Sequence, residues 1–262
     1  MKAGEILNSE KTAQLLSNIL EILEMMIESG AEIYRVEESA TRALGAYDVK
    51  RVDVYATTSN IILSFESKDG MVKTHTRRIK QITTDIEKVH RLNALIRRIT
   101  SVRLDPAIIE EELQKIRTTP KYPPILTILF YGIIAGAFFL FFGGRALPDL
   151  LASLGIGLIT GILVFLLDKI RANKFLVKFL CSLSACSLTF LLYRFSLISH
   201  VDYIIIGNIM TLIPGTGLTN SLRDLFTGDS ISGVLRLIEA ALLALAIACG
   251  YIVTLFMFGG AI

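Results

Sequence analysis

Four polar residues near the carboxyl end of the chain have the types and the spacing of a ligand-binding surface. Asn220, Arg223, Asp224 and Thr227 occupy positions i, i+3, i+4 and i+7, which share one face of an α-helix. Arg223 and Asp224 are sequence neighbours that do not face each other, so each requires its own partner. A guanidinium can hold a carboxylate through two parallel hydrogen bonds, so this stripe suits an acidic ligand.

The residues just before this stripe predict an interrupted helix. Proline lacks a backbone donor and glycine tolerates a break, so we expect a discontinuity at 214–217, then a short helix over 218–227 capped by Thr219 or Asn220. At membrane depth such a break must line a cavity or be buried in protein, and its new helix start offers N–H groups to an anion. A plain loop at the membrane surface is the alternative. The predicted substrate site comprises Asn220, Arg223, Asp224, Pro214, Gly215 and Gly217.

Two further charged groups are candidates for function. Glu239 lies in an apolar run, where a carboxylate indicates a proton relay, so we predict that Glu239 and Asp224 couple protons. A structural pair between Glu239 and Arg236, three residues earlier, is equally consistent with the spacing. Nearer the amino terminus, "SGAEIYRVEESATRAL" contains Arg35, Glu37 and Glu38, whose density of charge also fits a solvated, salt-bridged helix.

Several kinds of chemistry find no support in the sequence. Cys181, Cys186 and Cys249 lie in apolar runs without metal-ligand spacing, so neither a disulfide framework nor a metal site is expected. No Walker loop, dinucleotide-binding glycine motif or nucleophile elbow is present, and no cofactor is expected. The net charge of +3, spread over both signs, gives no reason to expect nucleic acid as a partner.

The elements that must position these residues follow from a sharp division in composition. Residues 1–121 contain 19 basic and 18 acidic residues, whereas 122–262 contain only 8 and 6. A bilayer core requires about 20 mostly apolar residues per helix. Gly132-xxx-Gly136 and Gly157-xxx-Gly161 favour close helix packing. We predict five transmembrane helices, at about 125–142, 147–167, 175–193, 201–218 and 234–258.

Residues 1–119 are expected to form a cytosolic α+β domain, and residues 120–262 the membrane domain. Periodicity predicts helices over 12–28 and 34–45, from Thr84, and from Asp105-Pro106, with strands at "RVDVYATT", "NIILSFES" and "MVKTHTRRI". The fold class is thus an α-helical multi-pass membrane protein with an amino-terminal α+β domain. The basic loop "DKIRANKFLVK" places the amino terminus in the cytosol and the carboxyl terminus outside the plasma membrane.

The chain resembles the threonine/serine exporter family in its split form. The resemblance extends over about residues 12–258 and is carried by "SGAEIYRVEES" and "LIPGTGLTNSLRDLFTGDSISGVLRLIEA". It implies secondary export, without enzymatic activity, of small carboxylate metabolites, either succinate or threonine and serine. It also implies a small membrane-only partner subunit, and leaves a higher oligomer open. The matched motif positions are Arg35, Glu37, Glu38, Pro214, Gly215, Asn220, Arg223, Asp224, Gly228 and Glu239.

Two other classes of function are compatible with the sequence. In one, the chain is a membrane-anchored regulatory or scaffolding subunit whose partner forms the pore. In the other, the soluble domain is a membrane-bound hydrolase, although no nucleophile and base signature supports it.

Overall fold

A computed structural model describes residues 9–47, 49–67, 70–120 and 122–258. The chain divides into two compact units: unit 1 contains residues 1–120 and 216–237, and unit 2 contains residues 121–215 and 238–262. Unit 1 therefore includes a segment from the apolar half of the sequence. The expected domain division into 1–119 and 120–262 stays a prediction.

Unit 1 begins with helices and continues through a small sheet. The described elements confirm the three predicted strands and the four predicted helices, although the first helix starts at Ser9, earlier than its periodicity indicated. The strands are antiparallel in the order β1-β2-β3. The elements are α1 (Ser9–Glu28), α2 (Ile33–Gly45), β1 (Arg51–Ala56), β2 (Asn60–Glu66), β3 (Val72–Arg78), α3 (Ile86–Val102) and α4 (Pro106–Arg117).

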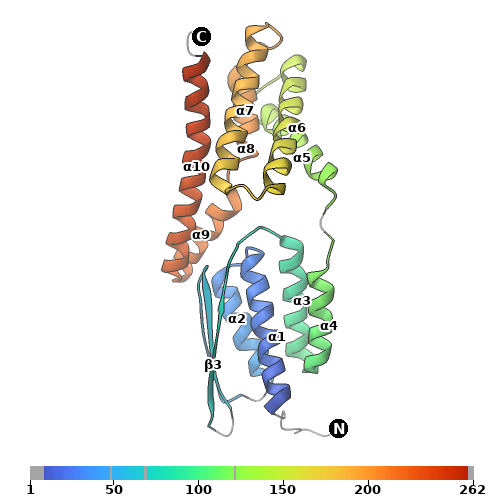
Figure 1. The fold of residues 1–262 in the computed structure, drawn as a ribbon, viewed down its shortest axis with the longest axis vertical. Coiled ribbons are helices and arrows are strands. Elements are labelled where there is room, and N and C mark those ends of the chain that lie inside the picture. Colours follow the sequence, from blue (N-terminus) through green and yellow to red (C-terminus); the bar gives the residue numbers. More distant parts are fainter. Residues whose placement is uncertain (1–8, 48, 68–69, 121, 259–262) are drawn as a thin grey trace. The chain divides into compact units, whose positions relative to one another are not determined.

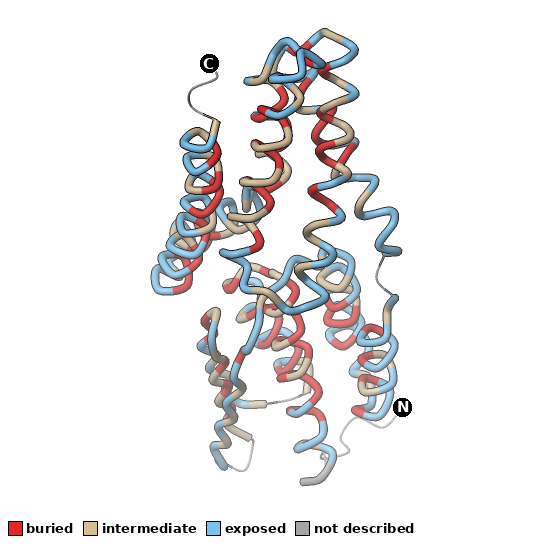
Figure 2. The backbone as a smooth tube through the Cα atoms, turned by 45° about the horizontal axis from the view of Figure 1, so that its top comes forward, coloured by how far each residue is buried: buried red, intermediate tan, exposed pale blue. Residues whose placement is uncertain are grey.

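The core of unit 1 lies where α1 and α2 cover one face of the sheet (Figure 1). The middle strand alternates between buried and partly exposed residues, and Ile61, Leu63 and Phe65 form its buried side. These side chains join the apolar face of α1, including Ile19 and Leu23, in one cluster. The buried residues follow one side of α2, α3 and α4 (Figure 2), as an amphipathic pattern requires, whereas α1 is buried around most of its circumference.

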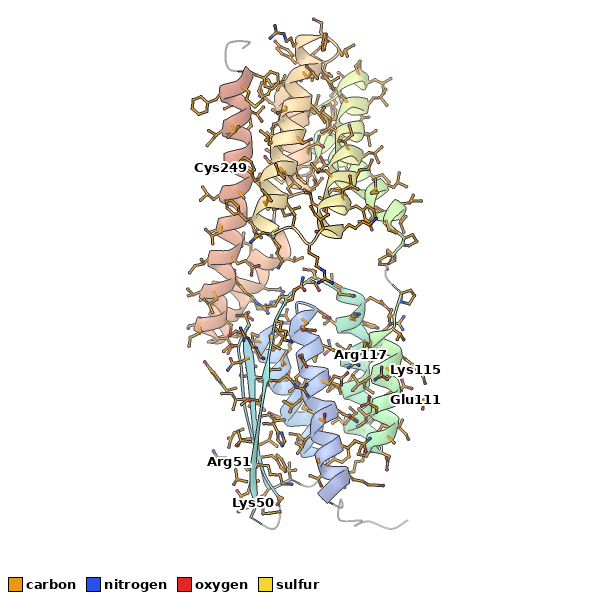
Figure 3. The ribbon with its side chains drawn as sticks, viewed as in Figure 1. Lys50, Arg51, Glu111, Lys115, Arg117 and Cys249 are labelled. Carbon is orange, nitrogen blue, oxygen red and sulfur yellow. The ribbon has the colours of Figure 1, made fainter. Side chains whose placement is uncertain are left out.

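Helices α3 and α4 both pack on α1, and each of them begins at an aspartate. The Asp85 carboxylate accepts a hydrogen bond from the Lys88 N–H at 3.0 Å, and Asp105 accepts one from the Ala107 N–H at 3.0 Å. Glu111 and Lys115 pair at 2.7 Å on the exposed face of α4 (Figure 3). The two caps define the starts of α3 and α4, and the ion pair marks the solvent side of α4.

The remaining helices have the composition of membrane spans. They are α5 (Pro124–Phe141), α6 (Leu147–Lys169), α7 (Lys174–Arg194), α8 (Val201–Met210), α9 (Gly215–Thr227) and α10 (Ser230–Phe258). Within the described ranges, α5, α6, α7 and α10 are long and apolar enough to cross a membrane. The bent pair α8 and α9 would be a fifth candidate if it forms one span. The mostly helical chain thus has the segments of a multi-pass membrane protein.

The break between α8 and α9 comes earlier than the sequence predicted. Helix α8 ends at Met210 and α9 begins at Gly215, so the interruption covers 211–214 rather than 214–217. Short-range backbone bonds tighten the end of α8, where the Leu212 N–H donates to the Ile209 carbonyl at 2.8 Å. Proline cannot donate to a preceding turn, but it is tolerated immediately before a helix, and the helix restarts directly after Pro214. Thr219 and Asn220 are consequently inside α9 and do not cap it.

Unit 2 depends on close packing of α5 against α6 through glycines. A Cβ atom at Gly157 would lie 2.8 Å from the Gly132 Cα and from the Tyr131 carbonyl oxygen, both backbone atoms. A Cβ at Gly161 would lie 3.1 Å from the Ile128 Cα. The glycine spacing in the sequence therefore predicted a real contact face, on which the backbones approach too closely for larger residues.

Replacing Gly157 with alanine should destabilise the chain, because the neighbouring backbone cannot move aside without disturbing α5. We expect a loss of ~1–3 kcal/mol, typical of overpacking, seen as a lower apparent melting temperature of the full chain in detergent. Gly155 is the matched control on the same helix, because its Cβ would meet nothing within 4 Å. Equal melting temperatures for Gly157→Ala and Gly155→Ala would contradict the packing.

Candidate functional site

The turn between α1 and α2 is built on a glycine that cannot be replaced without strain. Gly30 has a φ of 90°, and a Cβ there would lie 2.9 Å from the Thr83 carbonyl oxygen. The Gly30 N–H donates to the Ile27 carbonyl at 3.0 Å, and the Ala31 N–H donates to the Met26 carbonyl at 2.9 Å. Helix α1 therefore ends in a turn with Gly30 in the left-handed conformation. The carbonyl groups of Gly30 and Ala31 lie beyond the helix and require hydrogen-bond donors from elsewhere.

Side chains from α9 and α10 bind the polar groups of this turn. Asn220 donates to the Gly30 carbonyl at 3.0 Å, and Arg236 donates to the Ala31 carbonyl at 2.9 Å. Asp224 Oδ1 accepts from the Ile33 N–H at 3.3 Å. All of these residues belong to unit 1.

Asp224 acts as a cap for α2 although it lies on a different helix. The residue at the usual capping position of α2, Glu32, makes no side-chain capping hydrogen bond. Instead, the Asp224 carboxylate accepts a hydrogen bond from the N–H of Ile33, the first residue of α2. A negative charge at this position is also favoured by the helix dipole.

Asp224 and Arg236 form a buried ion pair. Their side chains are 0% and 7% exposed, and Arg236 Nη1 lies 3.2 Å from Asp224 Oδ2. The two groups attract each other as opposite charges but are not aligned for a hydrogen bond. Within the described residues, Asp224 Oδ2 has no hydrogen-bonding partner. Burial of both charges is tolerated because each side chain has a further partner in the α1–α2 turn.

Glu32 is shared by two arginines. One carboxylate oxygen pairs with Arg223, and the other lies 2.5 Å from Arg35 Nε. Arg35 Nε also donates to the Tyr34 hydroxyl at 3.0 Å. The Glu32 side chain is 12% exposed, whereas those of Arg223 and Arg35 are 46% and 49% exposed. The Glu32 side chain is thus largely covered and lies between two half-exposed arginine side chains.

The structure brings together parts of both sequence motifs. Asn220, Arg223 and Asp224 all contact residues 30–33, and Arg35 joins them through Glu32. As expected, Arg223 and Asp224 have different partners. Thr227, the last residue of the stripe, donates within α9 to the carbonyls of Arg223 and Asp224 and does not reach the turn.

The other two motif glutamates point elsewhere. The Glu37 carboxylate accepts from the Ala56 N–H at 2.7 Å, and its pKa is raised mainly by burial, with a further contribution from Asp229. Glu38 pairs with Arg42 at 2.7 Å, as predicted for the salt-bridged helix, but Arg35 pairs with Glu32 instead of Glu38.

Glu239 pairs with a residue that sequence spacing could not indicate. Its carboxylate lies 3.2 Å from Lys174 Nζ at the start of α7, and both side chains are 52% exposed. The alternative pair with Arg236 is therefore not the one formed, because Arg236 turns to Asp224. Pro214 lies in the break, whereas Gly215 and Gly217 lie in α9 with open space at their Cβ positions. Participation of these residues in binding or proton coupling stays a prediction.

Two important residues of the cluster were missed at the sequence level. Glu32 was given no role, although its position three residues before Arg35 could have indicated the observed pair. Gly30 lies within the quoted sequence motif, but its left-handed conformation and its place in the turn were not predicted. Among the described residues, no group of three or more histidines, cysteines, aspartates or glutamates is arranged to hold a metal ion.

The family model of threonine/serine exporters matches residues 18–258, nearly the whole chain. The chain belongs to the threonine/serine exporter family. This family comprises membrane transport proteins and not enzymes, so the hydrolase alternative is set aside.

The chain matches some relatives over almost their whole length and another over less than half of its length. It is 26% identical over 238 residues to the probable succinate transporter subunit YjjP of Klebsiella aerogenes, covering 89% of this chain and 90% of that protein. The Escherichia coli protein of the same name is 25% identical, with 89% and 91% covered. A probable threonine/serine exporter of Mycobacterium tuberculosis is 27% identical over 250 residues, covering 93% of this chain but 46% of that protein. No solved structure matches the chain.

Removing the charge of Asp224 should destabilise the exporter chain strongly. Asp224→Asn retains an oxygen for the Ile33 N–H but leaves the buried Arg236 without a counter-charge. We expect a loss of ~3–5 kcal/mol, measured as the melting temperature of the full chain in detergent.

Glu38→Gln is the matched control for this change, because it removes a carboxylate from an exposed pair with Arg42 that contributes at most ~1 kcal/mol. The double variant Asp224→Asn/Arg236→Met should recover part of the loss, since no unpaired charge stays buried. If Asp224→Asn melts at the same temperature as Glu38→Gln, the buried pair is not a stabilising constraint.

Proposed function

We propose that this chain is one subunit of a secondary exporter for small carboxylate metabolites, with succinate or threonine and serine as substrates. The observation that carries the proposal is the difference in coverage between its relatives. The chain matches about nine-tenths of proteins named as transporter subunits, but less than half of the protein named as an exporter. Because those relatives are named as subunits, we propose that this chain also works with a second membrane protein that completes the transport path.

We propose that the missing part is a small membrane-only subunit of the same family. If α8 and α9 form one span, this chain has five spans. A partner of similar fold and odd span number would then insert with inverted topology, an arrangement that commonly creates a substrate site between two repeats. We further propose that the amino terminus is cytoplasmic, that the carboxyl terminus lies outside the plasma membrane, and that residues 1–119 and 120–262 are separate domains.

The proposed substrate contacts follow from the chemistry of α9. Arg223 and Asn220 would hold the substrate carboxylate, while the break at Pro214 and the glycines Gly215 and Gly217 would allow the helix to adjust. The half-exposed Arg223 side chain supports this role, because it can be reached by a ligand from solution. Glu239 and Asp224 are the proposed proton-coupling groups.

A scaffolding role is the second candidate, and one observation favours it. Asn220, Arg223 and Asp224 are occupied by the α1–α2 turn in this structure, as expected of residues that dock one segment onto another. In that case the partner would form the whole pore, and this chain would regulate or support it.

Reconstitution separates these two functions. The full chain should be placed in proteoliposomes in three ways. It is reconstituted alone, with the proposed small membrane subunit, and with an unrelated small membrane protein in place of that subunit. We expect flux of labelled succinate or threonine only when both exporter subunits are present. Equal flux from the small protein alone would favour the scaffolding role, and absence of flux for both substrates would contradict the proposed substrate class.

Arg223→Gln should abolish export while leaving membrane insertion intact, because the amide lacks the charge that holds a carboxylate. Export by the two-subunit protein should fall to background, a loss of about 100-fold or more, as for loss of a charged hydrogen-bonding partner. Arg42→Gln is the control, since it removes a guanidinium from an exposed pair on α2. Normal export by Arg223→Gln would overturn the assignment of this residue.

Glu239→Gln should uncouple transport from the proton gradient, since the amide cannot exchange a proton at neutral pH. Flux driven by the substrate gradient is expected to persist, while the stimulation by an imposed pH gradient is lost. Measuring both fluxes beside Glu38→Gln controls for loss of a carboxylate elsewhere. Undiminished stimulation in Glu239→Gln would exclude this residue as the coupling group.

A further inference from the structure

We infer that Arg35 and Arg223 together form a carboxylate-binding site that Glu32 occupies while substrate is absent. This inference rests on the proposed function and names the internal group that competes with its substrate. Glu32 would thereby determine the apparent affinity of the chain for its substrate. The sequence alone did not suggest this role.

The first argument is the geometry of the Glu32 carboxylate. Its two oxygens are divided between two guanidinium groups, with one oxygen paired to Arg223 and the other 2.5 Å from Arg35 Nε. The arginines come from different segments, one from α2 and the other from α9, yet they converge on a single carboxylate. Such convergence is the arrangement by which proteins bind a carboxylate ligand.

The second argument is the excess of donors over acceptors. Two guanidinium groups offer ten N–H donors in total, whereas one carboxylate provides about four acceptor positions. Both arginine side chains are nearly half exposed, so part of this donor capacity faces solvent. An incoming carboxylate can therefore approach either guanidinium before Glu32 leaves.

The third argument is that the surrounding contacts hold the site in place without Glu32. Asp224 caps α2 and pairs with Arg236, and Asn220 and Arg236 bind the carbonyls of Gly30 and Ala31. None of these contacts uses the Glu32 side chain. Movement of Glu32 would therefore leave the α1–α2 turn attached to α9 and α10, so the segments that carry the two arginines would stay together.

An internal ligand lowers the apparent affinity for the external one. The measured dissociation constant is the intrinsic constant divided by the fraction of molecules in which the site is free. Because the Glu32 carboxylate is tethered beside both arginines, we expect it to be displaced only at high substrate concentration. Such competition would make the exporter respond to accumulation of its substrate.

The test is the binding of labelled succinate to the full chain in lipid nanodiscs, with threonine and inorganic phosphate as competing ligands. Glu32→Gln should bind succinate about tenfold more tightly than the unaltered chain, because the neutral amide competes poorly for the two guanidiniums. This gain should disappear in Glu32→Gln/Arg35→Gln and in Glu32→Gln/Arg223→Gln. Glu38→Gln, which removes a carboxylate from the same helix, should bind as the unaltered chain does.

Any of three results would contradict the inference. One is succinate binding by Glu32→Gln that is no tighter than in the unaltered chain. Another is a gain that survives loss of either arginine, which would locate the ligand elsewhere. Displacement of succinate by phosphate but not by threonine would also contradict a carboxylate site. Melting temperatures establish that each variant is folded. If Glu32→Gln does not fold, Glu32→Asp serves the same purpose, since its shorter side chain cannot bridge both arginines.

Failure of this inference is distinguishable from failure of the proposed function. If the two-subunit protein exports succinate and Arg223→Gln does not, while Glu32→Gln behaves normally, only the competing role of Glu32 is wrong. If the unaltered two-subunit protein carries no labelled substrate, the proposed function itself fails.

Discussion

Asp224 and Arg236 are charged side chains that are buried away from water. The arrangement of unit 1 around the α1–α2 turn depends on the partners that compensate these two charges. An ion pair at this depth recovers its desolvation cost only when the remaining hydrogen-bonding groups also find partners. The turn supplies one further partner to each side chain, since the Ile33 N–H donates to Asp224 Oδ1 and the Ala31 carbonyl accepts from Arg236. Each of the two motif segments therefore provides hydrogen-bonding partners for polar groups of the other.

The same contacts connect the architecture of the chain with its proposed chemistry. The α1–α2 turn provides backbone groups that are bound firmly and one carboxylate, Glu32, that is bound between half-exposed arginines. Buried contacts of the first kind are suited to permanent attachment, whereas partly exposed pairs are weaker and exchange partners more readily. Attachment and ligand exchange can thus occur within one cluster without opposing each other.

Much of the fold could be predicted because its determinants are local. Helices α1 to α4 and the three strands follow from periodicities of 3.6 and 2 residues, and the apolar helices follow from length and composition. Even the contact between α5 and α6 was indicated by glycine spacing, because a small residue acts through its own lack of a side chain. The break before α9 was misplaced, since the turn at 211–214 is defined by backbone hydrogen bonds that turn-forming residue types indicate only approximately.

The sequence by itself determined that Asn220, Arg223 and Asp224 share a helix face, and that Arg223 and Asp224 require different partners. Both conclusions depend only on helix geometry. Tertiary structure alone decided what those partners are, because Glu32 and Ile33 lie 191 residues away from them. The backbone groups of Gly30, Ala31 and Ile33 also carry no side-chain signature, so their pairing with Asn220, Arg236 and Asp224 arises only when the chain folds.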